Sequence, residues 1–170
     1  MRPLGLVVVV ALSLSLAACV PAPPERARDV VARGPLFETD AEALAAAEKV
    51  YREYSATSDD VGGGDSVDRI RAFLTPEWFE HEAEAYAALQ SRGIRTVGRT
   101  EIAFIRLKNT DFRRITIYAC QVTTNVRVQD TQGRDLTPRD RPPESLLEVT
   151  LVEDGAALRI AGSQLWSTSC

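Results

Sequence analysis

The hydrophobic period of the sequence changes once, near Ile94, and this change limits the folds open to the chain. Before it, apolar residues recur every three or four positions, as on one face of a helix. After it come four runs rich in β-branched and aromatic residues: "TEIAFIRL" (100–107), "RRITIYACQVTTNVRV" (113–128), "SLLEVTLV" (145–152) and "ALRIAGSQLW" (157–166). Asp154-Gly155 between the last two runs is a strong hairpin signal. Helices followed by antiparallel strands predict an α+β domain with its helices on one sheet face.

The helical part predicts three helices. Thr39 stands three residues before Glu42, the spacing of a capping box, so the first helix begins there. The segment "SDDVGGGDS" is expected to end this helix, with its three glycines forming a flexible loop. A short second helix is expected around Ile70. The third is expected from Thr75, a helix-capping residue followed by proline, to Gly93, which suits a left-handed stop.

The first residues, "MRPLGLVVVVALSLSLAAC", combine a charged start with an apolar run and small residues. The stretch Pro3–Ala18 has 16 residues, and a membrane-spanning helix needs about 20. This layout predicts a secretory signal peptide over residues 1–18. The proline-rich segment that follows, up to Glu38, is predicted to be an extended tether, and residues 39–170 to form a single domain.

Leu16-Ala17-Ala18-Cys19 resembles the lipobox of bacterial lipoproteins. The resemblance implies that the signal is cut before Cys19, whose sulfur then carries a diacylglycerol with palmitate-type chains. Two acyl chains hold a protein stably at a bilayer. We therefore expect a protein anchored by its lipid on the extracytoplasmic face of the cell membrane. The alternative is an ordinary secreted protein that is cut nearby and keeps Cys19 as a free thiol.

Removing the first 18 of the 170 residues would leave 152, the size of one domain. The formal net charge is −4, and because Arg2 is the one charge removed, the remainder carries −5. No basic cluster is present, so we expect no nucleic-acid partner. Lys49 and Lys108 are the only lysines among 20 basic residues. With the abundant alanine, this bias indicates a GC-rich bacterial genome.

Residues 39–170 resemble the cystatin-like, or nuclear-transport-factor-two-like, cone fold. Within it, three segments are similar to small uncharacterised lipoproteins of high-GC Gram-positive bacteria: "YAC" (118–120), "VQDTQG" (128–133) and "LRIAGSQLW…C" (158–170). The resemblance implies helices packed on a curved antiparallel sheet of about four strands. It also implies an extracytoplasmic location, but no particular activity.

With Cys19 acylated, Cys120 and Cys170 remain as an even pair in an oxidising compartment, where a disulfide is expected. In a plain meander Cys120 would lie within one strand, and Cys170 would lie at the end of the second strand after it. The residues after Trp166 would then have to bend back to bring the two α-carbons within about 7 Å. The alternative is two separate thiols, with Cys120 buried and Cys170 at a frayed end.

His81, the only histidine, shares one helix face with Glu77 and Glu84. Two carboxylates and one imidazole lack a fourth ligand, so we expect a solvated acidic face and no metal. No glycine-rich phosphate loop, Cys-x-x-Cys pair, His-Glu-x-x-His helix or nucleophile elbow occurs. The sequence therefore predicts no cofactor.

Enzymes of the ketosteroid-isomerase type use the pocket of the cone fold. That chemistry needs a carboxylate base on apolar walls and a neutral donor for a developing oxyanion. Glu148 is the strand carboxylate considered for this role, with Tyr51, Tyr86 and Tyr118 as donors. Because Glu148 alternates with apolar neighbours, we expect its side chain to face water. No catalytic residue is therefore predicted.

Trp78 and Trp166 are expected to be core anchors. In "ITIYACQV" both alternate sets are apolar, for example Ile117 on one face and Tyr118 on the other. This pattern predicts that the second face of the sheet is also covered, by the N-terminal spacer, a second copy or an envelope partner.

Three functions therefore remain open. We favour a non-enzymatic, membrane-anchored binding domain over a small isomerase or dehydratase using the cone pocket. The third is a spacer or assembly subunit of an envelope machine.

Overall fold

The computed structural model describes residues 36–170. The predicted signal peptide, Cys19 and nearly all of the predicted tether lie outside these residues. Within the described part, none of the helices has both the length and the apolar character needed to cross a membrane.

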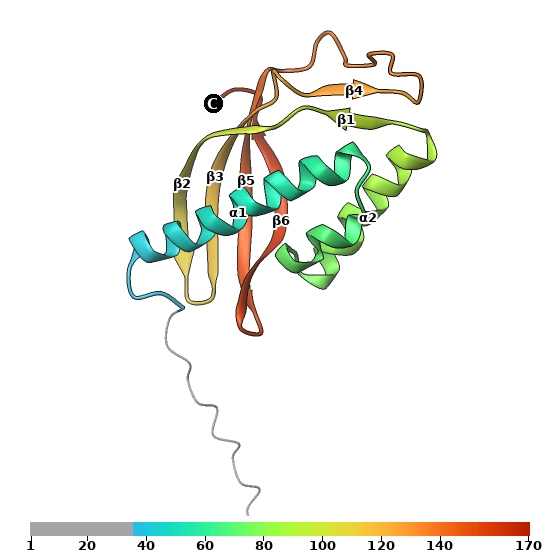
Figure 1. Ribbon diagram of the computed structural model, residues 1–170. Helices are drawn as coiled ribbons and strands as arrows, with labels where there is room; N and C mark the ends of the chain where they lie inside the picture. The colour runs from blue at the N-terminus through green and yellow to red at the C-terminus, as the bar shows by residue number, and fades with distance from the viewer. Residues whose placement is uncertain (1–35) are drawn as a thin grey trace, which may run out of the picture. The chain divides into compact units, whose positions relative to one another are not determined.

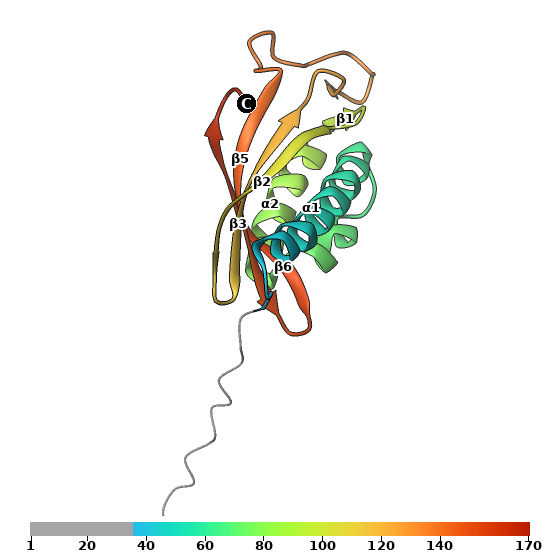
Figure 2. The same ribbon diagram turned by 90° about the vertical axis from the view of Figure 1, so that its left-hand side faces the viewer.

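The helices come first along the chain and the strands follow. The elements are α1 (Asp40–Gly63), the 3₁₀ helix η1 (Val67–Phe73), α2 (Pro76–Ser91), β1 (Arg95–Val97), β2 (Glu101–Asp111), β3 (Arg114–Val122), β4 (Arg127–Gln129), β5 (Glu144–Asp154) and β6 (Ala157–Ser167). Four strands form an antiparallel sheet in the order β2-β3-β5-β6, while β1 and β4 form a separate pair. Figures 1 and 2 show the helices on one face of the curved sheet, which confirms the predicted α+β class.

The start of α1 forms as its sequence predicts. The Thr39 hydroxyl oxygen accepts the backbone N–H of Glu42 at 3.2 Å, and the Glu42 carboxylate accepts the N–H of Thr39 at 3.3 Å. Each side chain thereby satisfies a backbone donor that the helix leaves free. The capping-box prediction is confirmed.

α1 ends at Gly63, within the segment predicted to end it, but Gly62 and Gly63 are helical, so the expected three-glycine loop is wrong. This last turn buries Val61, which is 1% exposed. It also brings Gly62 against β1, where an added Cβ would come within 2.2 Å of the Thr96 hydroxyl. Only Gly64, with a φ of 125°, leaves the helical conformation. The glycines therefore allow a close approach between helix and strand.

The other two helices lie where the sequence predicts them. η1 buries Ile70 but is a 3₁₀ helix. At the start of α2 the Thr75 hydroxyl accepts the N–H of Trp78 at 3.4 Å. Beyond its end, Gly93 has a φ of 66°, the left-handed conformation that glycine adopts without strain.

The strand boundaries depart from the sequence prediction in two places. The run 113–128 divides into β3 and β4, because the chain leaves the main sheet after Val122 to pair with β1. The polar segment 108–111, which lies outside the predicted run 100–107, continues β2 up to the pairing of Asp111 with Arg114. The hairpin at Gly155 is confirmed: Asp154 pairs with Ala157, and Gly155 has a φ of 65°.

The main core lies between α1 and the inner face of the sheet. Ala43 and Ala47 of α1 pack with Ile117 of β3 and with Val149 and Leu151 of β5 in one fully buried cluster. The strand residues alternate as expected, with these side chains inward. Burial of this apolar surface is the main favourable term in folding.

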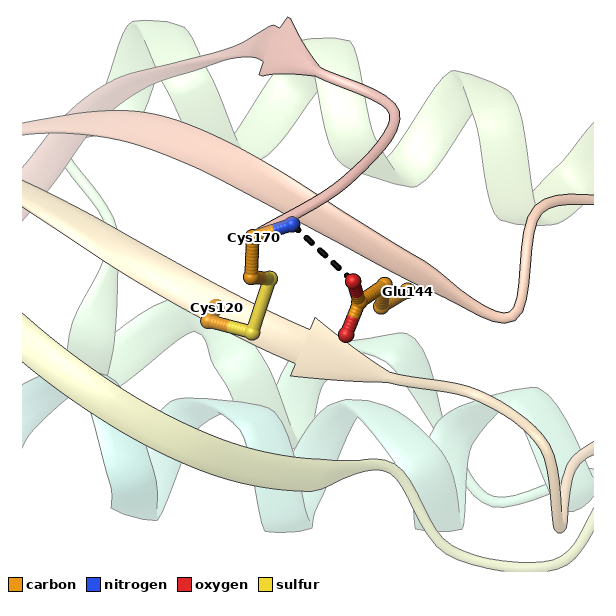
Figure 3. A group of neighbouring side chains, drawn as sticks. All are labelled: Cys120, Glu144 and Cys170. Atoms are coloured by element: carbon orange, nitrogen blue, oxygen red, sulfur yellow. Dashed lines mark hydrogen bonds between the residues drawn. A yellow bond between two sulfur atoms is a disulfide. The ribbon is translucent and has the colours of Figure 1, made fainter.

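A disulfide joins Cys120 to Cys170. Their α-carbons lie 5.8 Å apart, because the chain turns back after β6 and reaches β3 (Figure 3). The carboxylate of Glu144, the first residue of β5, accepts the backbone N–H of Cys170 at 3.1 Å. This bond and the disulfide fix the C-terminal residues over the outer face of the sheet.

We expect Cys170→Ser to lower the free energy of unfolding by about 3–4 kcal/mol, because the bond closes a long loop in the unfolded chain. Urea unfolding of the oxidised chain measures this loss, with Ser169→Ala as the control at a neighbouring position. Equal stability of the wild type before and after reduction and alkylation would contradict the prediction.

Candidate functional site

Glu148 faces outward from the sheet, as its alternation predicts. Its carboxylate pairs with Lys108 and accepts a hydrogen bond from the Gln164 amide at 3.2 Å. The hydrogen bond from Lys108 lowers the pKa of the Glu148 carboxyl. Tyr118 and Trp166 lie on the same face, with ring centroids 5.4 Å apart. Trp166 is 56% exposed, so its prediction as a core anchor is wrong.

Trp166 is exposed because of its place at the end of an edge strand. β6 has no neighbour beyond β5, and its pairing shifts register between Leu146 and Leu147. The Trp166 ring lies beside that of Tyr118, and the Lys108 ammonium lies 4.8 Å from its centroid, yet 56% of the residue stays exposed. Trp78, by contrast, is partly buried against the main core.

A second polar cluster lies on the helix side of the sheet; the sequence named its Tyr51 and Tyr86 as donors but missed Tyr54 and Glu82. It contains Tyr51 and Tyr54 of α1 with Glu82 and Tyr86 of α2, and we call it the inner cluster. Glu82 stands four residues before Tyr86 on α2, so both side chains point toward α1. That spacing was the available signal in the sequence. However, α2 carries several other carboxylates, and nothing local distinguishes Glu82 from them.

Burial governs the protonation of this cluster. It raises the pKa of the Glu82 carboxyl, while a hydrogen bond from Tyr54 and the nearby His81 act in the opposite direction. Burial also raises the pKa of the Tyr51, Tyr54 and Tyr86 hydroxyls. The tyrosines therefore stay neutral donors, and Glu82 holds a proton more readily than an exposed carboxyl does.

The hydroxyls of the inner cluster already have partners within the protein. The Gln121 amide of β3 donates to the Tyr51 hydroxyl at 3.0 Å. The Tyr86 hydroxyl is hydrogen-bonded to the Ser58 hydroxyl and also lies 3.3 Å from the Ser58 carbonyl. These bonds connect α1 to the sheet and to α2, so they hold the layers together.

The predicted stripe of His81, Glu77 and Glu84 does not gather into a metal site. All three side chains are exposed, and the His81 ring lies against Trp78 with centroids 4.6 Å apart. Within residues 36–170 the one group of three candidate donor atoms is that of Cys120, Glu144 and Cys170, all within 4.8 Å of one another (Figure 3). Both sulfurs are bonded to each other, so neither offers a thiolate to a metal.

A cleft opens at the C-terminal ends of α1 and α2, and we call it the helix-end cleft. Its volume is about 340 Å³. Its apolar wall consists of Val61, Tyr86, Leu89 and Ile94, and Arg95 lies among the lining residues. Tyr86 thus belongs to both sites: its ring lines the cleft and its hydroxyl belongs to the inner cluster.

No protein-family model matches the chain, and no curated protein is significantly similar to it. Among solved structures, it is similar to one from Catenulispora acidiphila, with a TM-score of 0.53 and 11% identity over 74% of this chain and 91% of that one. It is also similar to the intermembrane space region of the chloroplast protein ARC6, with a TM-score of 0.52 and 9% identity over 72% and 95%. At such identities the likeness concerns the fold alone. The chain has the predicted cystatin-like or nuclear-transport-factor-two-like cone fold.

Glu82→Gln should become more stable relative to wild type as the pH rises from about 4 to 7. Because the pKa of Glu82 is raised in the folded state, ionising it favours the unfolded chain, and wild type loses that stability as the pH passes the folded pKa. Urea unfolding at a series of pH values measures the difference. Glu84→Gln removes an exposed carboxylate from the same helix and serves as the control. A pH-independent difference for Glu82→Gln would contradict the assignment.

Proposed function

We propose that this chain is a lipoprotein anchored on the extracytoplasmic face of a bacterial cell membrane. Its cone domain would bind a ligand or an envelope partner without catalysing a reaction. We favour binding over catalysis because tyrosine hydroxyls of the inner cluster are bonded to the protein's own side chains.

The anchor is supported by the sequence. A charged start, an apolar run and Leu16-Ala17-Ala18-Cys19 follow one another in the order of a lipoprotein signal. Each buried methylene contributes about 0.8 kcal/mol, so two acyl chains on Cys19 would hold the protein at the bilayer. The similarity to small lipoproteins of high-GC Gram-positive bacteria would place it at the outer face of the cytoplasmic membrane.

The geometry of the inner cluster favours binding over catalysis. Acid–base catalysis needs a base and an oxyanion donor aimed at a common point that a substrate can occupy. The Tyr86 hydroxyl is bonded to Ser58, and redirecting it to a substrate would break that bond, which costs about 1–3 kcal/mol. The Tyr51 hydroxyl accepts the Gln121 amide of β3, which holds it against the sheet.

The outer face of the sheet is the surface that favours a protein partner, in addition to a ligand bound elsewhere. Trp166 is more than half exposed beside Tyr118 on this face. An exposed aromatic side chain of this size is typical of interaction surfaces. We propose that a second copy or an envelope partner covers this face.

A small isomerase or dehydratase is the second candidate, and one observation favours it. Glu82 is a carboxyl with a raised pKa beside the neutral Tyr54 hydroxyl, which are the two roles that proton abstraction next to a carbonyl requires. An enzyme of this kind would exchange the α-protons of enolisable ketones with D₂O. Glu82→Gln would then abolish the exchange, whereas a binding domain would give none in either form. NMR of a ketone panel distinguishes the two.

Cys19→Ala should move the protein from the membrane to the soluble fraction, since it removes the acylated sulfur. Cell fractionation measures this release, and mass spectrometry of the wild-type N-terminal peptide should show Cys19 as the first residue with added acyl mass. Cys170→Ser removes a different cysteine and should stay with the membrane. A wild-type chain that begins at another residue, or carries no acyl mass, would overturn the anchor.

A further inference from the structure

We infer that the helix-end cleft binds a small organic anion with an apolar body, such as an aryl or alkyl carboxylate or sulfonate. The inference names the ligand class for the proposed binding function and rests on it.

The size and walls of the cleft suit a small molecule. Its volume of about 340 Å³ lies at the lower end of the range of about 300–1,000 Å³ for ligand sites. Leu89, Ile94, Tyr86 and the buried Val61 are among its lining residues. Figure 1 shows the C-terminal ends of α1 and α2 near β1, and all three elements contribute lining residues.

Gly63 borders the cleft, and the backbone does not need a glycine there. It lies inside the last turn of α1 without a positive φ, where glycine costs about 1 kcal/mol relative to alanine. A Cβ on Gly63 would meet only the Thr96 carbonyl oxygen, at an ordinary 3.8 Å. Gly62, in contrast, is required by its contact with Thr96. Of the two glycines, position 63 is therefore the one at which a side chain can be added to test the cleft.

Arg95 supplies the charge that selects an anion. Among residues 36–170 it forms no ion pair, whereas nearby Arg99 pairs with Asp60 at 2.6 Å and Arg127 with Asp135 at 3.5 Å. No carboxylate is among the residues that line the cleft. A guanidinium offers two parallel donors to a carboxylate or sulfonate, and such charged bonds are stronger beside an apolar wall.

The C-terminal ends of α1 and α2 do not cancel the preference of the cleft for an anion. Carbonyl groups at a helix C-terminus carry partial negative charge when they lack donors. Here the N–H of Gly64 bonds to the Asp60 and Val61 carbonyls of α1, and the N–H groups of Gly93 and Ile94 bond to the Gln90 and Leu89 carbonyls of α2. The net positive group at the cleft is therefore Arg95.

The test uses the full chain carrying Cys19→Ala, so that no detergent is needed. The probes are 8-anilinonaphthalene-1-sulfonate and N-phenyl-1-naphthylamine, which share an apolar body and differ in the sulfonate. Fluorescence titration should show saturable binding of both, with the sulfonate tighter. Arg95→Gln should weaken the sulfonate by about tenfold or more and change the neutral probe by less than about twofold, since tenfold corresponds to one lost charged contact. Gly63→Leu should weaken both by a similar factor.

Two matched controls accompany these variants. Arg139→Gln removes an exposed arginine that does not line the cleft and should leave both affinities unchanged. Gly63→Ala adds one methyl group, and should raise the stability of the helix while retaining binding. Circular dichroism shows whether Gly63→Leu folds. Should it not, ¹⁵N–¹H NMR of the otherwise unmodified chain still locates the sulfonate, through shifts at Leu89, Ile94 and Arg95.

Several results would overturn the inference. Shifts confined to other residues, or no saturable binding, would exclude the cleft as the site. Equal loss of both probes in Arg95→Gln would show that charge does not select the ligand. Failure of the proposed function is separate: loss of the Cys19 anchor is read from fractionation, and catalysis from ketone exchange, and neither result depends on these titrations.

Discussion

The close packing of α1 on the sheet is the interaction on which the rest of the structure depends. Ala43 and Ala47 stand four residues apart, and both are fully buried against the sheet. Their small side chains let the helix approach the strands, and one turn later Tyr51 meets the Gln121 amide of β3. Because this contact fixes the direction of the helix, the last turn of α1 reaches β1, where Gly62 touches Thr96. The position of the helix-end cleft follows from that contact.

The two faces of the sheet have separate chemistry, although β3 contributes to both. Its inward residues, among them Ile117, are buried under α1, while Tyr118 and Cys120 face outward. The outer face is partly covered by the chain itself, since the disulfide brings Cys170 over Cys120. Glu148 therefore pairs with Lys108 on one side of the sheet, and Glu82 contacts Tyr54 on the other. Glu148, the β5 carboxylate considered for a cone-pocket enzyme, thus lies on the outer layer, as its alternation along the strand predicts.

The features that could be predicted from the sequence are those fixed by neighbouring residues. The capping box at Thr39, the turn at Gly155 and the alternation along β5 each depend on a few adjacent positions. The features that were missed depend on distant contacts. α1 stays helical through Gly62 and Gly63 because Val61 is buried by other elements, and β4 exists because β1 lies beside it. The spacing of Glu82 from Tyr86 is a weak local signal, since only tertiary packing separates Glu82 from the exposed Glu84 two residues later.

Tyr86 connects the inner cluster to the cleft, and this connection argues for a preformed site. The phenol ring is a wall of the cleft, while its hydroxyl is held by Ser58 of α1. Turning the ring away would break that bond and leave a partly buried hydroxyl without a partner, so the wall keeps its position before any ligand arrives. A ligand that binds against an already ordered wall loses little affinity to rearrangement of the site. The same restraint makes Tyr86 a poor donor to a reacting oxygen, because its hydroxyl is already bonded to Ser58. The Tyr86 side chain thus makes the binding surface rigid and, for the same reason, argues against catalysis.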